Sequence, residues 1–139
     1  MHVEPGMEVI PRARCLKLLE SKRVGRLGFV ADGGQPIVLP VNYAVAADIV
    51  LFRTGVGTKL EAALGAKVAF QVDDIDVERA SGWSVLVQGV AEEITDDPGG
   101  FAAILRESLA PTWVPGPADH SVRIVPRLIS GRRLPGPQR

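Results

Sequence analysis

The sequence has very little cysteine and histidine. Cys15 is the single cysteine among 139 residues, and His2 and His120 are the two histidines. One thiol cannot form an internal disulfide, and this small set cannot supply a multi-cysteine or histidine-cluster metal site. Cys15 shares one face of a segment of helical spacing with Leu18 and Leu19, where a free cysteine behaves as a small buried apolar residue. A nucleophilic role for Cys15 is the alternative.

The chain also lacks an excess of charge and a long apolar run. Lys plus Arg and Asp plus Glu each number 16, so no net field attracts nucleic acid or an anionic membrane. Apolar residues make up 46% of the chain. Uninterrupted apolar runs are nevertheless far shorter than the roughly 18 to 20 residues that cross a bilayer. The first residues show neither the basic nor the apolar region of a secretion signal. We therefore expect a cytoplasmic protein that binds neither nucleic acid nor a membrane.

What the sequence does contain is a series of short strand patterns. Apolar runs or alternations bounded by turn residues predict six strands, at about 24–30, 36–43, 49–53, 68–72, 81–91 and 121–130. One helix is expected before them, at about 11–22, and two between them, at about 58–64 and from Asp97-Pro98 onward. Because a parallel sheet would need a crossover helix after nearly every strand, the order favours an antiparallel sheet. The predicted fold is mainly β with flanking helices, an antiparallel barrel of about six strands.

Two of these strands carry further signals. Pro40 cannot donate a hydrogen bond to a neighbouring strand, so it predicts a sheet edge or a bulge in the strand 36–43. The strand 81–91 is apolar on both faces until Gly89, as expected for the centre of a barrel or for a subunit interface. An acidic loop is expected at 73–76, after the strand 68–72.

The stretch 49–60 is the strongest candidate for a ligand site. It leads from an apolar strand through a glycine turn into a short helix, and two cations and two hydroxyls gather there: Arg53, Thr54, Thr58 and Lys59. A turn that feeds a helix N-terminus offers unpaired N–H groups to an anion, Arg can grip phosphate oxygens with its planar fork, and Lys adds a point charge. The alternative is a strand-turn-helix corner with solvated basic ends. The segment is not a Walker A loop, because Thr58 precedes Lys59.

Five motifs follow one another between about residues 11 and 133. They are Val24-Gly25-Arg26-Leu27-Gly28-Phe29, Leu39-Pro40-Val41-Asn42-Tyr43, Phe52-Arg53-Thr54 with Thr58-Lys59, Gly82-Trp83-Ser84-Val85, and Asp119-His120-Ser121-Val122-Arg123-Ile124 followed by Gly131-Arg132-Arg133. In this order they resemble the pyridoxamine 5'-phosphate oxidase-like family, and especially its short, nitroimidazole-reductase-like branch. The resemblance implies a flavin-binding split β-barrel over residues 1–133, followed by a flexible tail at 134–139.

The resemblance also implies a homodimer with two FMN sites at the subunit interface. Arg53, Thr54, Thr58 and Lys59 would hold the FMN phosphate, and Pro40, Val41 and Asn42 would line the flavin ring. The partner subunit would supply an aromatic wall at the position of Trp83, with Trp113 and His120 as further cofactor-binding candidates. For the two tryptophans the alternative is core or dimer packing, and for His120 it is a structural hydrogen bond.

Two functions are compatible with these motifs. In the first, FMN passes electrons or hydride to a small organic acceptor, and the protein supplies binding, orientation and charge. In the second, the barrel binds or sequesters a flavin, a deazaflavin or a tetrapyrrole without catalysis, because no acid, base or nucleophile set is evident. A deazaflavin-dependent reductase is a rival within the enzyme class. Conversion of pyridoxamine phosphate is disfavoured, because no second cluster of basic and hydroxyl residues is found for the substrate's phosphate.

Overall fold

The structure is a computed structural model that describes residues 6–55, 59–95, 100, 103 and 120–137. Its elements are β1 (Glu8–Ile10), α1 (Arg12–Glu20), β2 (Val24–Val30), β3 (Pro36–Asn42), β4 (Ala44–Ala46), β5 (Ile49–Thr54), the 3-10 helix η1 (Lys59–Ala63), β6 (Lys67–Asp76), β7 (Ser81–Glu93) and β8 (His120–Leu134). All six predicted strands are present. The two additional ones, β1 and β4, have three residues each.

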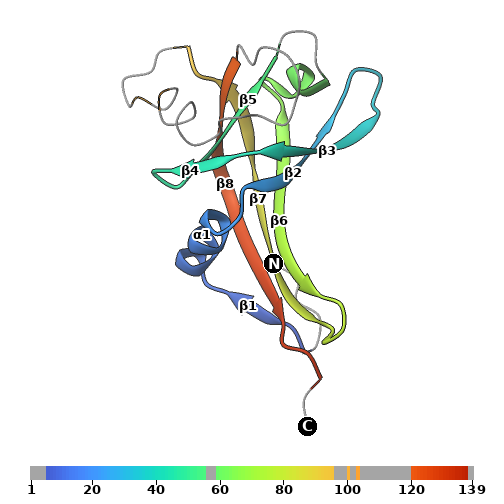
Figure 1. The fold of residues 1–139 in the computed structure, drawn as a ribbon. Helices are drawn as coiled ribbons and strands as arrows, with labels where there is room; N and C mark the ends of the chain where they lie inside the picture. The colour runs from blue at the N-terminus through green and yellow to red at the C-terminus, as the bar shows by residue number, and fades with distance from the viewer. Residues whose placement is uncertain (1–5, 56–58, 96–99, 101–102, 104–119, 138–139) are drawn as a thin grey trace.

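The strands form one antiparallel sheet that curls into a half-open barrel (Figure 1). Their order is β3-β2-β6-β7-β8-β5-β4, and β1 pairs with β8 beside this path. The two outermost strands, β3 and β4, are consecutive in the chain and are joined by Tyr43 alone. The chain thus passes from one edge of the sheet to the other through a single residue, and β3 also contacts β5. The predicted split antiparallel barrel is confirmed.

The core lies inside the curl of this sheet, and alternating residues of the strands fill it. Side chains on successive residues of a strand point to opposite faces. The members with almost no exposed surface include Leu27, Phe52, Phe70, Val85, Val87, Val122 and Ile124. Burying one such side chain fully contributes about 1.5–3 kcal/mol. The core therefore joins β2, β5, β6, β7 and β8, the strands that carry most of the predicted motifs.

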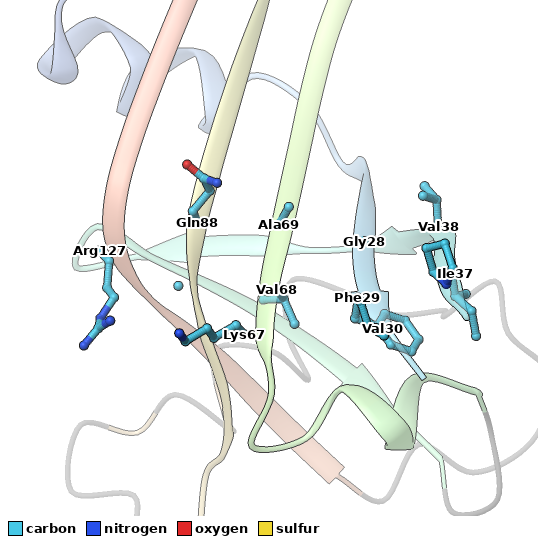
Figure 2. A pocket seen from close by; sticks show the side chains of 12 residues that line it. Gly28, Phe29, Val30, Ile37, Val38, Lys67, Val68, Ala69, Gln88 and Arg127 are labelled. Atoms are coloured by element: carbon cyan, nitrogen blue, oxygen red, sulfur yellow. The ribbon is translucent and has the colours of Figure 1, made fainter. Parts of the chain in front are cut away.

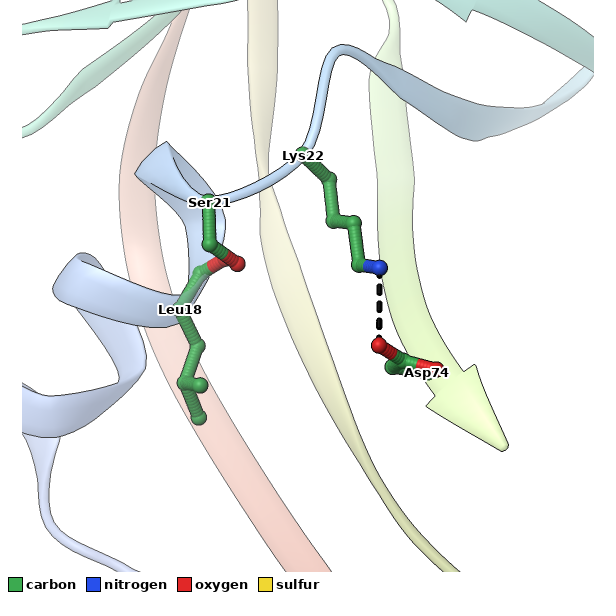
Figure 3. A network of polar contacts seen from close by, with 4 residues as sticks. All are labelled: Leu18, Ser21, Lys22 and Asp74. Atoms are coloured by element: carbon green, nitrogen blue, oxygen red, sulfur yellow. Dashed lines mark hydrogen bonds and ion pairs between the residues drawn. The ribbon is translucent and has the colours of Figure 1, made fainter. Parts of the chain in front are cut away.

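Helix α1 covers one side of the core with Cys15, Leu18 and Leu19, as its spacing predicts. The Sγ atom of Cys15 lies 3.5 Å from the carbonyl oxygen of Ile10, and the thiol is buried. At the end of the helix, Ser21 donates its hydroxyl hydrogen bond to the carbonyl of Leu18 over 2.6 Å. Lys22 then forms an ion pair of 2.8 Å with Asp74 of β6 (Figure 3). Both side chains are substantially exposed, so this pair adds little stability and mainly orients the connection.

The turn between β2 and β3 and the edge of the sheet at β3 lie where glycine and proline in the sequence favour them. Gly33 and Gly34 connect β2 and β3 with φ angles of 85° and 82°, values that glycine adopts without a steric penalty. Pro40 lies opposite Arg26 on the edge strand β3, so the predicted edge position is confirmed. No helix in the described part of the chain has the length and apolar character needed to cross a membrane.

Three expectations differ from the structure or fall outside it. The predicted acidic loop 73–76 is wrong, because Asp73 to Asp76 continue β6 and pair with Ser84 to Ser81 of β7. The last strand runs to Leu134 rather than ending near Ser130, because its far end pairs with both β1 and β7. The helix predicted from Asp97-Pro98 lies largely outside the described residues.

Candidate functional site

The end of β5 presents one basic side chain outward. Phe52 belongs to the barrel core, whereas Leu51 packs in a small second cluster on the opposite face of the strand. Alternation assigns Arg53 to the face of Leu51 and Thr54 to that of Phe52. Arg53 is half-buried, and Thr54 is 2% exposed with its hydroxyl 3.4 Å from the carbonyl oxygen of Gly55. The strand therefore offers the guanidinium to a ligand more readily than the hydroxyl.

Lys59 begins the element that follows. The predicted helix 58–64 is instead a 3-10 helix of five residues, η1, which buries Leu60 and Ala63 and leaves Lys59 exposed. Such a short turn carries little of the dipole of a long helix, so anion binding here depends mainly on the side chains. Lys59 follows Gly55 by four residues, so their Cα atoms can be at most about 14 Å apart. Thr58 itself lies outside the described residues.

The strand β3 brings the three predicted ring-lining residues to this end of the barrel. Pro40 is exposed, Val41 is buried and Asn42 is half-buried. Beyond Tyr43, Ala44 pairs with Leu51 of β5. Because β4 and β5 are antiparallel, residues before Ala44 lie toward residues after Leu51, which brings Asn42 toward Arg53. The contact between β3 and β5 agrees with this direction. The end of β3 therefore lies beside β5, and a shared role of Asn42 and Arg53 in binding a flavin stays a prediction.

His120 opens β8 at the same end of the sheet. It lies opposite Thr54 on β5, one residue before the partner of Arg53, Ser121. Its Nδ1 atom contacts the carboxylate of Glu93 at the end of β7. This ion-pair geometry matches the structural alternative considered for His120, because it ties the start of β8 to β7.

Trp83 lies at the other end of the barrel. It pairs with Asp74 of β6 and Arg133 of β8, whereas Glu93, ten residues further along β7, lies beside His120. Ten strand residues cover about 33 Å. Trp83 is half-buried and packs against the core from its own end. Within one chain it does not join Arg53 and His120, and Trp113 lies outside the described residues.

Two other groups that could react, the phenol of Tyr43 and the thiol of Cys15, are buried in the core. Burial raises the pKa of the Tyr43 phenol, whose hydroxyl donates a hydrogen bond to the carbonyl of Leu19. Burial also raises the pKa of the Cys15 thiol, although its hydrogen bond to the backbone partly opposes this shift. Among the described residues no group of three or more His, Cys, Asp or Glu side chains could hold a metal ion.

Comparison with known proteins identifies the family. The model of a family described as pyridoxamine 5'-phosphate oxidase matches residues 11–133. The chain belongs to this family. The match includes every motif from which the resemblance was predicted, from the strand at Val24 to Arg133.

Three relatives illustrate how closely this member of the family matches others. The uncharacterized protein Rv0080 of Mycobacterium tuberculosis is 34% identical over 131 residues, which cover 90% of this chain and 84% of that protein. The structure of the FAD binding protein from Mycobacterium smegmatis is 37% identical with a TM-score of 0.72, and the match covers 90% of this chain and 96% of that one. A FAD-binding protein from Mesorhizobium loti is 28% identical with a TM-score of 0.69, covering 91% and 96%.

A pocket that includes none of the predicted site residues opens elsewhere on the sheet (Figure 2). Its volume is about 490 Å³, and its lining residues come from β2, β3, β6, β7 and β8 and their ends: Gly28, Phe29, Val30, Pro36, Ile37, Val38, Lys67, Val68, Ala69, Gln88, Gly89 and Arg127. Sequence reasoning missed it because these residues meet only through strand pairing. The available signal was the presence of small residues, Gly28 and Ala69, inside two predicted strands.

Proposed function

We propose that this protein binds a flavin nucleotide and that Arg53 and Lys59 hold the phosphate of that cofactor. The observation that carries the proposal is the basic corner after β5, where a half-buried guanidinium and an exposed ammonium flank the short connection to η1. Arg supplies a planar donor fork and Lys a point charge, which together suit a phosphate dianion. The two FAD-binding relatives, at 37% and 28% identity, support a flavin as the ligand.

Three cofactors that carry a phosphate are candidates for the basic corner: FMN, FAD and a deazaflavin. FMN and FAD both carry a phosphate on the ribityl chain, so the same corner can serve either one. The sequence predicts FMN, whereas the names of the two relatives favour FAD. A deazaflavin also carries a ring and a phosphate and is the third candidate. We propose a flavin first, with the ring extending from Arg53 toward Asn42 and Pro40.

We further propose that the flavoprotein is an oxidoreductase that acts on a small organic acceptor. A bound flavin supplies hydride and electron transfer, while the chain binds and orients it and balances its phosphate charge. The rival is a binding module without catalysis. It is favoured by one observation: the phenol of Tyr43, the thiol of Cys15 and the ring of His120 are all engaged in contacts within the fold.

The predicted homodimer belongs to the same proposal. Trp83 lies about ten strand residues from the basic corner of its own chain, so a second copy would have to bring its Trp83 there. Val125, Leu128 and Leu134 of β8 are 40%, 54% and 41% exposed, and such side chains favour contact with a second copy. We propose that each cofactor site combines the basic corner of one subunit with the Trp83 end of the other.

The deciding experiment compares FMN, FAD and riboflavin on the double variant Arg53→Ala/Lys59→Ala. Riboflavin lacks the phosphate, so the variant should lose at least about tenfold in affinity for FMN while riboflavin binding changes less than about twofold. Arg14→Ala/Lys17→Ala is the matched control, because both residues are exposed on α1. Equal losses for FMN and riboflavin would refute the phosphate corner. Absence of binding by all three flavins to the wild-type protein would refute the function.

Catalysis needs a separate measurement. The wild-type protein loaded with its preferred flavin should oxidise a nicotinamide cofactor steadily when a nitroaromatic or quinone acceptor is present. Stable binding with no turnover, even when the flavin is supplied in reduced form, would favour the binding module.

A further inference from the structure

We propose that Arg26 is the cation that faces the flavin ring and stabilises the negative charge of the reduced cofactor. The inference rests on the proposed flavin site, in which the basic corner holds the phosphate and the ring lies toward Asn42 and Pro40. Arg26 belongs to neither part of that site, because it lies on the adjacent strand, β2.

The barrel core fixes the direction of the Arg26 side chain. Gly25 and Leu27, its neighbours in β2, are both buried. Gly25 makes room for the ring of Phe70, because a Cβ atom on Gly25 would lie 2.3 Å from the Cζ atom of that ring. Since successive side chains of a strand point to opposite faces, Arg26 stands on the outer face of the sheet, where it is exposed.

Strand register places Arg26 beside the predicted ring-lining segment. Arg26 pairs directly with Pro40 of β3. Directly paired residues stand on the same face of a sheet, with their Cβ atoms about 4.5–5.5 Å apart. Pro40 is exposed and lacks a polar side chain, so it offers an apolar surface to a flat ring. A flavin ring that lies on Pro40 therefore comes within reach of the Arg26 guanidinium.

The same outer face continues to the basic corner. Tyr43 is buried in the core, so its neighbours Asn42 and Ala44 point outward. Ala44 pairs with β5 on the face that also carries Arg53. Continued along β5, this register brings Asn42 opposite Arg53, and strand spacings of about 4.8 Å with a rise of about 3.4 Å per residue put the Cα atoms of Arg26 and Arg53 roughly 12 Å apart. Two separated cations suit a flavin, because the ribityl chain holds its ring away from its phosphate.

The fold leaves the charge of Arg26 available. Within the described part of the chain Arg26 forms no ion pair. Asp73 of β6 lies on the same face, two residues beyond Gln71, which pairs with Arg26. The Asp73 carboxylate instead accepts a hydrogen bond from the Gln71 amide over 2.7 Å. The guanidinium can therefore serve an anionic ligand without breaking a contact of the fold.

The surface beside Arg26 has apolar space for a ring. Gly28 follows Arg26 on the same face of β2, and with Val38 and Ala69 it lines the pocket of about 490 Å³ (Figure 2). Among the described residues that line this pocket there is no carboxylate. Charges interact more strongly beside an apolar surface than in bulk water. One guanidinium can therefore distinguish two ring states that differ by one charge.

The charge of the ring depends on its redox state. An oxidised flavin ring is neutral, and a ring that takes up two electrons and one proton carries one negative charge. Arg26 attracts the charged state and gains nothing from the neutral one. It therefore favours binding of the reduced cofactor over the oxidised cofactor and raises the reduction potential of the bound flavin.

The test measures the dissociation constants of the preferred flavin nucleotide in its oxidised and dithionite-reduced forms, without oxygen, and the midpoint potential of the bound flavin. Arg26→Gln should weaken binding of the reduced form at least about tenfold more than binding of the oxidised form, which lowers the potential of a two-electron couple by about 30 mV. Arg26→Lys keeps the charge and should restore most of this difference. Arg14→Gln, at an exposed position of α1, is the matched control and should change neither value.

Oxidised riboflavin separates the ring from the phosphate. Arg26→Gln should change the binding of oxidised riboflavin and of the oxidised nucleotide equally, by less than about threefold. A larger loss for the nucleotide would make Arg26 part of the phosphate site and would overturn the proposal. Equal losses for the oxidised and reduced forms, or an unchanged potential, would also overturn it, while the flavin-binding function would stand. Absence of flavin binding by the wild-type protein would refute both proposals.

Stability and assembly provide the last control. Because Arg26 is exposed and forms no ion pair within the described residues, Arg26→Gln should keep the melting temperature and the oligomeric state of the wild-type protein. A change in oligomeric state, measured by light scattering, would assign Arg26 to contact between subunits and would overturn its role toward the ring.

Discussion

Tyr43 packs the edge of its ring against Phe70, with the ring centroids 4.8 Å apart and the planes inclined by 70°. Tyr43 is the single residue between β3 and β4, the two edges of the sheet, and Phe70 lies on β6 in the middle of the strand order. The Tyr43 hydroxyl also donates a hydrogen bond to the carbonyl of Leu19 in α1. One side chain thus links the closure of the barrel to its centre and to the helix that covers it.

Tyr43→Phe should destabilise the protein while keeping its fold. The substitution retains the aromatic contact with Phe70 and removes the buried hydroxyl, which leaves the Leu19 carbonyl without this donor. Loss of one partner of a buried hydrogen bond costs about 1–3 kcal/mol. Urea unfolding followed by tryptophan fluorescence should show a lower midpoint with an unchanged slope. An unchanged midpoint would mean that the hydroxyl contributes no net stability.

The same phenol should make stability sensitive to alkaline pH. Burial raises the pKa of Tyr43, so the folded state favours the neutral form more than the unfolded state does. The phenol of a tyrosine in the unfolded chain ionises at about pH 10. The contribution of the Tyr43 phenol to the free energy of unfolding is therefore complete below that pH, and it is lost as the pH rises toward the higher pKa of the folded state. The difference in free energy of unfolding between the wild-type protein and Tyr43→Phe should therefore decrease between about pH 9 and pH 11, by up to ~1.4 kcal/mol per pH unit. A constant difference across this range would contradict the assignment.

Two glycines of the sheet should respond in opposite ways to alanine. A Cβ atom on Gly28 would meet nothing closer than 3.7 Å, whereas one on Gly89 would lie 2.2 Å from the Val125 carbonyl oxygen. Gly28→Ala should change the free energy of unfolding by less than about 1 kcal/mol, and Gly89→Ala should lower it by about 3 kcal/mol or more because backbone must move. Urea unfolding of both variants checks this, and similar values for the two would contradict the close approach of the Val125 carbonyl to Gly89.

Periodicity was enough to predict the six longer strands and the barrel class. Strands β2 and β7 have seven or more residues, and burial alternates along much of each, although the sequence of β7 is apolar on both faces until Gly89. The three-residue strands β1 and β4 are too short for any period to appear. The acidic end of β6 was missed for a different reason. Asp74 and Asp76 are exposed and owe their strand conformation to pairing with β7, which composition does not reveal.

The candidate site likewise has parts that local sequence predicts and parts that depend on strand pairing. Arg53 and Lys59 could be predicted because a strand, a glycine turn and a short helix follow one another in the chain. The pocket lined by Gly28 and Ala69 could not be predicted, because it depends on which residues of β2 and β6 face each other. The position of Arg127 depends on a bulge, and one extra residue in a strand leaves no mark on local composition.

The separation of Trp83 from Arg53 leads to a test of the shared cofactor site. If one subunit supplies the basic corner and its partner supplies the tryptophan, then Arg53→Ala/Lys59→Ala and Trp83→Ala should each impair both sites of their own homodimer. Trp83 packs partly against the core, so the stability of its variant must be measured alongside flavin binding.

Mixed dimers of the two variants should then recover binding. A heterodimer contains one site that carries all the substitutions and one site that carries none, because each site takes its corner and its tryptophan from different chains. Random mixing of equal amounts makes half of the dimers mixed, so about a quarter of all sites should bind flavin with wild-type affinity. Co-expression with two affinity tags would isolate the heterodimer, in which half of the sites should be intact. If the corner and the tryptophan belonged to one chain, no site in the heterodimer would be free of substitutions, and its binding would remain as weak as that of the two parents.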